Sequence, residues 1–329
     1  MNFRILGTGS CLPQRVVTNE ELTQFLDTSD EWIRTRTGIS SRHIMTGEET
    51  VTTLAAEASR RAMEMAGVTA KELDYILCPT IGGDYISPGL SSTVEEALGA
   101  DCPTLDVNGA CSGFIYALDV AQALFMSGKV KKILVVSGEG LSRIADWNDR
   151  ATCVLFGDGA GAVVLGEGGS LLSTRLGCTG RSAPLYIPYY AGNCPVGGEK
   201  KYHHGLKMDG REVYKFAVNA IEQELRAVLE DAGIAQDMVA QVFLHQANRR
   251  IIEAAAKKLE IPPERYGINI DRVGNTSSAS IPILMDEYNR AGKLRDGDIV
   301  LMCGFGAGLT TGASAAAGWR SDGDARGDG

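Results

Sequence analysis

The sequence predicts a layered α/β fold made of two similar halves, and two patterns lead to this prediction. Short apolar runs rich in β-branched residues alternate with segments of helical period, which is typical of βαβ units. One half of the chain also resembles the other, and such a repeat indicates the architecture before local detail does. The apolar runs are Tyr75 to Cys78, Ile133 to Ser137, Val163 to Leu165, Val242 to Leu244 and Ile299 to Cys303.

The repeat is visible when Val107 to Gly140 is placed beside Val273 to Gly306. Both segments contain small polar residues, a helical stretch, a glycine and lysine, an apolar run and a Gly-x-Gly turn. Matching Gly138 to Gly304 gives an offset of 166 residues and places Cys111 opposite Ser277. We therefore expect two halves, residues 1–170 and 171–320, packed face to face about a pseudo-twofold axis.

The ends of the chain and its first helix can be predicted from short signals. The opening residues, MNFRILGTGSCLP, have too short an apolar run for a secretory signal and are expected to form a strand. Asp27 to Asp30 offer N-cap oxygens for a helix over EWIRTRT that ends at Gly38. Residues 321–329, SDGDARGDG, are nearly devoid of apolar side chains and are expected to form a disordered tail.

Composition excludes several classes of protein. The 329 residues are 44% hydrophobic and 22% charged, as in a globular protein, and no run approaches the roughly 20 apolar residues that span a bilayer. We therefore expect a cytoplasmic protein with no membrane partner. The formal charge of -9 argues against nucleic-acid binding, so an acidic partner would need a local basic patch. Eight cysteines are scattered singly, which predicts neither a metal site nor a disulfide framework.

Cys111 is a candidate nucleophile because of its place in NGACSGF, just before the helical stretch FIYALDVAQALF. A thiol at a helix N-terminus lies near the positive end of the helix dipole, which is expected to lower its pKa. Gly109 and Gly113 allow the sharp turn that would present it. The alternative from this stretch alone is a small buried cysteine that fills a gap in the core.

His245 and Asn275 are candidate hydrogen-bond donors. His245 closes the apolar run VFLH, where a histidine can point into a cleft and meet developing negative charge, although a hydrogen-bonded core histidine fits the same position. Asn275 lies in VGNTSSASIP, where its amide could stabilise an enolate or simply serve the turn. A thiol in one half and two donors in the other are what acyl transfer followed by carbanion chemistry needs.

Six motifs, in order and spacing, resemble those of the 3-oxoacyl-[acyl-carrier-protein] synthase III family. They are NGACSGFIYAL, FGDGAGAVVL, MDGREVYKFAV, HQANRRI, GNTSSASIP and CGFGAGLTTG, and the resemblance runs to about Trp319. It implies the thiolase fold, in which duplicated βαβ-type halves form a five-layer αβαβα sandwich. It also implies a homodimer.

The same resemblance implies roles for individual residues. Cys111, His245 and Asn275 would form a catalytic triad, with an oxyanion hole from the backbone N–H groups of Cys111 and Ala307 and with Phe305 beside them. Residues implied to bind coenzyme A are Trp32 and Arg150 around the adenine, Thr28 and Arg36 near the nucleotide, and Gly210 and Asn248 along the pantetheine. Residues implied to dock an acidic carrier protein are Lys215, Arg250, Lys257 and Lys258.

The implied reaction joins an acyl group from coenzyme A to a malonyl unit on acyl carrier protein, with decarboxylation, and so initiates fatty acid synthesis. Coenzyme A enters as part of the substrate, and no separate cofactor is expected. Without the resemblance, Trp32 would be a helix-packing residue, and the basic face would be solvated with Glu253 pairing to Lys257. Thr311 and the loop GDYISPGLSS depart from the family pattern, which leaves the starter acyl group open.

Three other functions remain open from the sequence. A degradative thiolase would carry histidine in place of Asn275 and cysteine in place of Phe305. A specialised relative could start polyketide or quinolone synthesis, or transfer an acyl group without decarboxylation. A catalytically silent scaffold is the third alternative, although the nucleophile and both donors are present.

Overall fold

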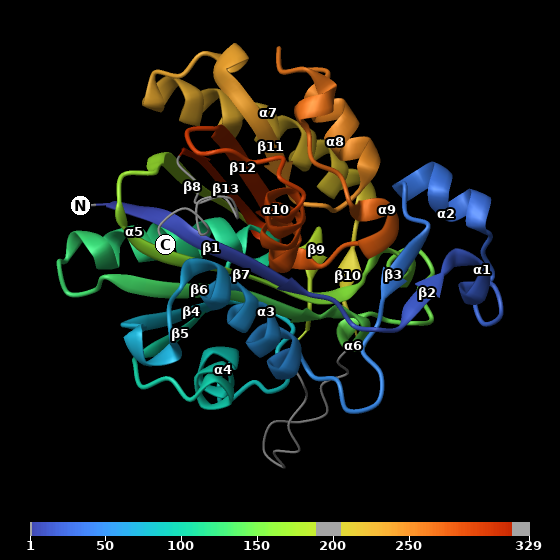
Figure 1. The fold of residues 1–329 in the computed structure, drawn as a ribbon. Coiled ribbons are helices and arrows are strands. Elements are labelled where there is room, and N and C mark those ends of the chain that lie inside the picture. The colour runs from blue at the N-terminus through green and yellow to red at the C-terminus, as the bar shows by residue number, and fades with distance from the viewer. Residues whose placement is uncertain (1, 189–204, 318–329) are drawn as a thin grey trace, which may run out of the picture.

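The computed structural model describes residues 2–188 and 205–317 and contains two main β-sheets (Figure 1). The first sheet has the order β1-β7-β6-β4-β5, and the second has the order β11-β12-β13-β8. All five apolar runs predicted from the sequence lie within strands. The strands of the first sheet are β1 (Asn2–Cys11), β4 (Tyr75–Pro79), β5 (Thr104–Val107), β6 (Lys132–Gly140) and β7 (Asp158–Gly168), and those of the second are β8 (Leu171–Arg181), β11 (Val239–Leu244), β12 (Ile299–Gly306) and β13 (Gly308–Ala316).

The two sheets share one pattern of strand directions. In the first, β4 runs parallel to β6, and the β6–β7 and β7–β1 pairs are antiparallel. In the second, β11 runs parallel to β12, and the β12–β13 and β13–β8 pairs are antiparallel. The repeat inferred from the sequence is thus present in the fold. The boundary between residues 170 and 171 stays a prediction, and β8, which begins at Leu171, lies in the second sheet.

Helices form three layers around the sheets, which gives the predicted αβαβα sandwich (Figure 1). Helices α3 (Val51–Ala66) and α4 (Leu90–Leu98) cover the outer face of the first sheet. Helices α5 (Gly113–Met126) and α10 (Ser280–Arg290) lie between the sheets. Helices α7 (Gly210–Ala232) and α8 (Arg249–Ala256) cover the second sheet.

The central layer explains why α5 is apolar on most of its surface. Phe114, Ile115 and Leu118 are fully buried because a helix between two sheets must pack on both sides. They belong to a cluster that includes Phe3 of the first sheet and Met302 of the second. Each such buried side chain contributes about 1.5–3 kcal/mol of transfer free energy, so this layer holds the halves together.

Short elements from both halves pack into a further cluster at one end of the sandwich. Helix α2 (Asp30–Thr37) begins as predicted, with Ser29 Oγ accepting a hydrogen bond from Trp32 N at 3.1 Å, and ends at Gly38 with φ of 81°. The remaining elements are α1 (Asn19–Leu22), β2 (Val16–Thr18), β3 (Ser41–His43), η1 (Ala70–Glu72), η2 (Ala110–Ser112), α6 (Leu141–Ile144), η3 (Cys153–Leu155), β9 (Leu185–Tyr186), β10 (Lys207–Met208), η4 (Gln236–Met238), η5 (Pro263–Arg265), α9 (Ile270–Val273) and η6 (Ser277–Ala279), where η marks a 3-10 turn.

The tail predicted for residues 321–329 lies outside the described residues. Within the described ranges, no helix combines the length and the apolar character needed to cross a membrane.

Candidate active site

Cys111 lies in the 3-10 turn η2, which leads directly into α5. The turn η6 leads into α10 in the same way, and each turn has a non-glycine residue at positive φ, Ala110 at 48° and Ser277 at 49°. These two residues are 167 positions apart, so Cys111 is equivalent to Ser278. The sequence match had placed it opposite Ser277, because the spacing between turn and strand differs by one residue in the two halves.

The end of β12 passes very close to the Cys111 turn. A Cβ atom on Gly306 would lie 2.7 Å from Cys111 N, and one on Gly304 would lie 2.8 Å from Ser112 Cα. Real Cβ atoms do not approach backbone this closely, so glycine is required at both positions. The Gly-x-Gly pattern therefore brings the second half against the candidate nucleophile.

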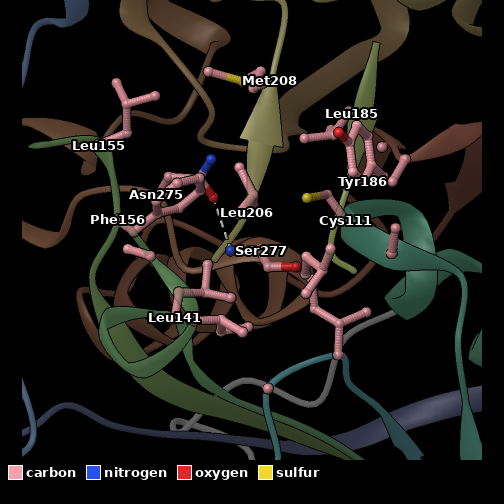
Figure 2. A pocket seen from close by; sticks show the side chains of 18 of the residues that line it. Cys111, Leu141, Leu155, Phe156, Leu185, Tyr186, Leu206, Met208, Asn275 and Ser277 are labelled. Atoms are coloured by element: carbon pink, nitrogen blue, oxygen red, sulfur yellow. Dashed lines mark hydrogen bonds between the residues drawn. The ribbon is translucent and has the colours of Figure 1, made fainter. Parts of the chain in front are cut away.

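A cavity of about 1290 Å³ gathers the five residues predicted for catalysis. Figure 2 shows the Cys111 sulfur and the Asn275 side chain on opposite sides of this cavity, together with apolar side chains around it. The predicted residues that line it are Cys111, His245, Asn275, Phe305 and Ala307.

His245 is held at the end of β11 by contacts on three sides. Its backbone N–H donates to Cys303 O at 2.8 Å, and its ring Nδ1 lies 2.8 Å from Ser280 Oγ. Phe305 packs edge-on against the ring, with centroids 5.2 Å apart and an interplanar angle of 67°. Burial lowers the pKa of the imidazole from 6.5 to about 3, so the ring is neutral at pH 7.

Asn275 is oriented as a hydrogen-bond donor to the cavity. Its Oδ1 accepts from Ser277 N at 2.8 Å, as the dashed line in Figure 2 marks. Its backbone N–H donates to Leu155 O at 2.9 Å, and its backbone O accepts from Gly157 N at 3.0 Å. Because Oδ1 is engaged, the NH₂ group is the end left for a substrate.

The Cys111 thiol does not have the lowered pKa expected from its place before a helix. Burial raises its pKa from 9.0 to about 12, a hydrogen-bonding effect of Ser277 opposes this rise, and the charge of Glu139 adds to it. The expectation was wrong because segments of the second half pack around the half-buried Cys111 turn, and the loss of water disfavours the charged thiolate. In the free protein, a neutral thiol therefore faces the same cavity as a neutral imidazole.

Glu139 is a buried carboxyl beneath the site that the sequence reasoning missed. It is fully buried on β6 and accepts hydrogen bonds from Ser278 Oγ at 2.6 Å and Ile81 N at 3.1 Å. Burial raises its pKa from 4.5 to about 7. The available signal was one charged residue within the otherwise uncharged segment ILVVSGEG.

Thr310, also missed, ties Ala307 to the Cys111 turn. Its Oγ1 lies 3.0 Å from Ala307 O and 3.2 Å from Gly109 O, and it accepts from Ser112 Oγ at 2.7 Å. The two segments predicted to supply the oxyanion hole are therefore linked by one side chain. Sequence offered no signal for this, because the contact joins residues about 200 positions apart.

The residues predicted to bind coenzyme A fall into two groups. Gly210 and Asn248 line the cavity, whereas the other four lie outside it. In the outer group, the guanidinium carbons of Arg36 and Arg150 are 4.8 Å and 5.4 Å from the centre of the Trp32 ring. Asn248 Nδ2 donates to Arg36 O at 3.0 Å and joins the two groups.

Two of the outer residues have notable polar surroundings. Arg150 pairs with Asp27, with 3.2 Å between Nη1 and Oδ2. Thr28 precedes the N-cap of α2, and its buried Oγ1 has no hydrogen-bond partner within the described chain. Asp27, which holds Arg150, and Thr28 therefore both belong to the segment that directly precedes Ser29, the N-cap of α2.

The predicted basic face lies on α7 and α8. Lys215, Arg250 and Lys257 are exposed, and within the described residues they form no ion pairs. Lys258 differs, since its Nζ pairs with Glu222 at 2.8 Å. Glu253 pairs with Arg249 at 3.0 Å and not with Lys257, so the ion pair expected in the alternative interpretation is wrong, while the exposure of this face fits both interpretations.

The two departures from the family pattern lie in different places. Thr311 donates to Glu224 Oε1 at 2.9 Å and is not a lining residue of the cavity. The loop departure does bear on the site, because Asp84, Tyr85 and Ile86 line the cavity.

Comparisons with known proteins agree with this geometry. Family models described as 3-oxoacyl-[acyl-carrier-protein] synthase III and its C-terminal part match residues 105–180 and 229–317. The chain is 46% identical over 314 residues to beta-ketoacyl-[acyl-carrier-protein] synthase III of Xanthomonas campestris pv. campestris, covering 94% of this chain and 97% of that one.

Solved structures give the same result. The 3-oxoacyl-[acyl-carrier-protein] synthase III of Aquifex aeolicus is similar with a TM-score of 0.88 and 44% identity over 96% of this chain and 99% of that one. The priming beta-ketosynthase of the R1128 polyketide biosynthetic pathway has a TM-score of 0.90 and 35% identity over 97% of each chain. The predicted thiolase fold and condensing-enzyme class are confirmed, and the chain belongs to the 3-oxoacyl-[acyl-carrier-protein] synthase III family.

Proposed function

We propose that this chain carries out its family's decarboxylative condensation with Cys111 as nucleophile and with His245 and Asn275 as donors. The starter is an acyl-CoA, the acceptor is malonyl-acyl carrier protein, and the product is a 3-oxoacyl carrier protein that begins fatty acid synthesis. The observation that carries the proposal is that a thiol, a neutral imidazole and an oriented amide line one cavity.

In the first half-reaction, Cys111 sulfur attacks the thioester carbonyl and coenzyme A leaves. The thiol must lose its proton on the way, because its pKa is raised to about 12. The backbone N–H groups of Cys111 and Ala307 would stabilise the oxyanion. The acyl group is then held as a thioester on Cys111.

In the second half-reaction, the malonyl group loses carbon dioxide and forms an enolate. Its oxygen is stabilised by His245 Nε2–H and by the Asn275 amide, whose Oδ1 is already engaged. The enolate carbon attacks the acyl thioester carbonyl, the bond to the Cys111 sulfur breaks, and the released thiolate takes up one proton from solvent.

The apolar side of the cavity is suited to an acyl chain. Large apolar side chains surround the space in front of Cys111, so a hydrocarbon group buried there leaves no polar atom without a partner. These side chains are Leu141, Leu155, Phe156, Leu185, Leu206 and Met208. Coenzyme A would reach them past Gly210 and Asn248, with its adenine between Trp32 and Arg150.

The exposed basic residues beside the cavity support docking of an acidic carrier protein. Lys215, Arg250 and Lys257 have unpaired charges within the described chain, on a protein with a formal charge of -9. Arg250 also lies over the ring of Tyr214, a lining residue, with 5.9 Å from its guanidinium carbon to the ring centre. A carrier protein bound here would be close to the cavity.

A homodimer is proposed from the edge of the first sheet. Strand β5 pairs with β4, no strand of the described residues pairs with its other edge, and Leu105 on it is 44% exposed. Nearby, Tyr85 and Ile86 line the cavity and are 64% and 62% exposed. A second copy on this edge would bury them and complete the pocket wall.

A second candidate function is priming of polyketide synthesis. The observation that supports this second function is the 35% identity to the R1128 priming ketosynthase. The two functions share the condensation step and differ in starter and carrier protein, so substrate preference separates them. A degradative thiolase is disfavoured by Asn275 and Phe305, and a cytoplasmic location without a separate cofactor stays a prediction from the sequence.

The test is to incubate the pure protein with acyl-CoA thioesters of different length and branching and weigh it intact. We expect one acyl adduct, mapped to Cys111 and missing in Cys111→Ala, which retains the exposed Cys178 as an internal control. No adduct from any thioester would refute the proposal and favour a scaffold. Adding malonyl-acyl carrier protein to the acylated enzyme should release the adduct as a 3-oxoacyl product.

A further inference from the structure

Glu139 is a fully buried carboxyl on β6, and within residues 2–188 and 205–317 no lysine or arginine pairs with it. Its Oε1 accepts from Ser278 Oγ at 2.6 Å and lies 3.4 Å from Ser278 N, and its Oε2 accepts from Ile81 N at 3.1 Å. Thr80 Oγ1 lies 3.4 Å from Oε2, but its proton has a shorter partner in Gly138 O at 2.7 Å. The carboxyl is therefore held mainly by two segments, the loop after β4 and the turn η6.

The repeat shows that the fold does not require a carboxyl at this place. Matching Gly138 to Gly304 makes Glu139 equivalent to Phe305 on β12, which is also buried but apolar. Strand β6 contacts η6 as β12 contacts η2, so the two residues belong to equivalent surroundings. Burying a carboxyl without a cation has a cost in free energy that a phenylalanine does not have. A polar group retained at such a cost indicates a role in the site.

Ser278 belongs to the turn that orients the Asn275 amide. Its neighbour Ser277 donates its backbone N–H to Asn275 Oδ1 at 2.8 Å, so a shift of the turn would move this bond. The Ser277 hydroxyl also acts on Glu139, since hydrogen bonding from it lowers the pKa of the carboxyl. On the other side of the carboxyl, Ile81 lines the cavity. Glu139 thus joins a cavity wall of the first half to the turn of the second half that orients Asn275.

The Ser278 hydroxyl can keep its bond to Glu139 in both protonation states of the carboxyl. Its Oγ also lies 3.1 Å from Pro79 O, which can only accept, and contacts the Ser137 hydroxyl. When the carboxylate is ionised, Ser278 donates to it and Ser137 donates to Ser278. When the carboxyl is neutral, its Oε1–H donates to Ser278, and Ser278 donates to Pro79 O. The link therefore persists while Glu139, whose pKa is about 7, titrates.

We infer that Glu139 is a positioning residue that acts through Ser278 to hold turn η6, and with it the Asn275 amide, in place for the enolate. Glu139 is not a lining residue of the cavity, so its effect on the substrate passes through the turn. The consequence for condensation rests on the proposed function, whereas the link between Glu139 and the Asn275 side chain does not.

The direct test is the ¹⁵N amide spectrum of the full chain labelled on its asparagine side chains. The Asn275 NH₂ signals are those missing from Asn275→Ala. In Glu139→Leu, which cannot bond Ser278, we expect these signals to shift. Glu139→Gln should leave them near wild type, because its NH₂ can donate to Ser278 Oγ while its Oε1 accepts from Ile81 N. Unchanged Asn275 signals in Glu139→Leu would overturn the inference.

Single-turnover kinetics tests the consequence for the reaction. In Glu139→Leu, we expect condensation to fall by about 10-fold, the effect of losing roughly one buried hydrogen bond, and Glu139→Gln to restore most of it. Acylation of Cys111 should be at least as fast as in wild type, because the charge of Glu139 raises the pKa of this thiol. An acylation step slowed as much as condensation would show general damage to the site instead.

Two combinations of variants test the route of the effect. Ser278→Ala alone should slow condensation like Glu139→Leu, and the two changes together should cost about 10-fold and not 100-fold, because both break the same link. In the Asn275→Ala background, Glu139→Leu should have no further effect on condensation. Full additivity in either combination would show that Glu139 does not act through Ser278 and Asn275.

Asp286→Asn is the matched control, because Asp286 is another buried carboxyl, 1% exposed, that accepts from Thr8 Oγ1 at 2.8 Å and Arg290 Nε at 2.9 Å. We expect this variant to melt at a lower temperature with the Asn275 signals in place. If the Asn275 signals move equally in Asp286→Asn and Glu139→Leu, they report loss of stability and the inference fails.

The outcomes separate this inference from the proposed function. If no acyl-CoA acylates Cys111 but Glu139→Leu moves the Asn275 signals, the proposed function fails and the link stands. If the wild-type protein condenses normally and Glu139→Leu changes neither the signals nor condensation, the function stands and the inference fails. Should Glu139→Leu fail to fold, Ser278→Ala decides the question by the same measurements.

Discussion

At the scale of single residues, both predicted donors are oriented by the serine turn that leads into α10. Ser277 N engages Asn275 Oδ1 at 2.8 Å, and Ser280 Oγ engages His245 Nδ1 at 2.8 Å. These contacts engage Asn275 Oδ1 and His245 Nδ1 within the protein, so neither atom is available to a substrate. The remaining ends, an amide NH₂ and Nε2, are the ones left for the cavity.

Replacing Asn275 with alanine should separate the two half-reactions. We expect acyl-Cys111 to form at a near-normal rate, while condensation falls by about 100- to 1,000-fold because one oxyanion donor is lost. Single-turnover measurement of each half-reaction checks this. Gln223→Ala, at an exposed amide on the outer helix α7, is the control and should leave both rates unchanged. Normal condensation in Asn275→Ala would contradict the assigned role.

The buried imidazole should make the protein less stable in mild acid. The unfolded chain takes up a proton on His245 below about pH 6.5, whereas the folded protein does so only near pH 3. The free energy of unfolding therefore falls as the pH drops through this window, by about 2 kcal/mol between pH 7 and pH 5 from this residue. Urea denaturation at both pH values checks it, since His245→Gln should lose that much less. An equal loss in both proteins would count against a neutral buried His245.

At the scale of elements, the site depends on strand β12 approaching the Cys111 turn. The Cys111 turn belongs to the first half of the chain and the Gly304 to Gly306 segment to the second, and their backbones nearly touch. Small errors in this packing would move the oxyanion donors relative to the sulfur, and positioning errors of about 1 Å can cost 100-fold in rate.

The variant Gly306→Ala should damage both stability and acylation. The added Cβ would lie 2.7 Å from Cys111 N, so the strand or the turn must shift, at a cost of about 1–3 kcal/mol. Thermal melting and the acylation rate measure the two effects. Gly180→Ala is the matched strand control, because nothing lies within 4 Å of its Cβ position. If both variants melt and become acylated like the wild-type protein, the close approach of Gly306 to Cys111 does not matter for stability or acylation.

Helix α2 and the loop that carries Arg150 should control the affinity for coenzyme A thioesters. Arg150→Ala removes a cation from the Trp32 ring, and we expect KM for acyl-CoA to rise by about 3- to 30-fold with little change in kcat. Steady-state kinetics checks this. Arg34→Ala is the control on the same helix, since Arg34 pairs with Asp30 at 3.3 Å. An equal rise in KM for both variants would point to a general charge effect.

At the scale of the whole molecule, the β5 edge should pair two copies of the chain. Light scattering should give twice the chain mass of 35.0 kDa. Leu105→Asp places a charge on this edge and should shift the protein toward the monomer with reduced activity. Met238→Asp, at a residue that is 59% exposed on η4, should leave the mass unchanged. A wild-type monomer would exclude this interface.

The sequence by itself determined the duplicated α/β architecture, the strands around its apolar runs and the identity of the triad candidates. The strands follow from the local periodicity of apolar residues. The triad candidates follow from motifs that can be recognised in the sequence without a structure, so Cys111, His245 and Asn275 could be named from the chain alone. The start of α2 at Ser29 and its end at Gly38 were equally local, because caps are set by neighbouring residues.

Only the tertiary structure decided the electrostatics and the support of the site. The Cys111 pKa rises instead of falling, because segments of the second half pack around the half-buried thiol and remove water from it. Glu139, Thr310 and Ser280 gain their roles from contacts with residues distant in the chain or from burial. Desolvation and hydrogen-bond geometry depend on which segments meet in space, and one residue's neighbours in sequence do not fix that.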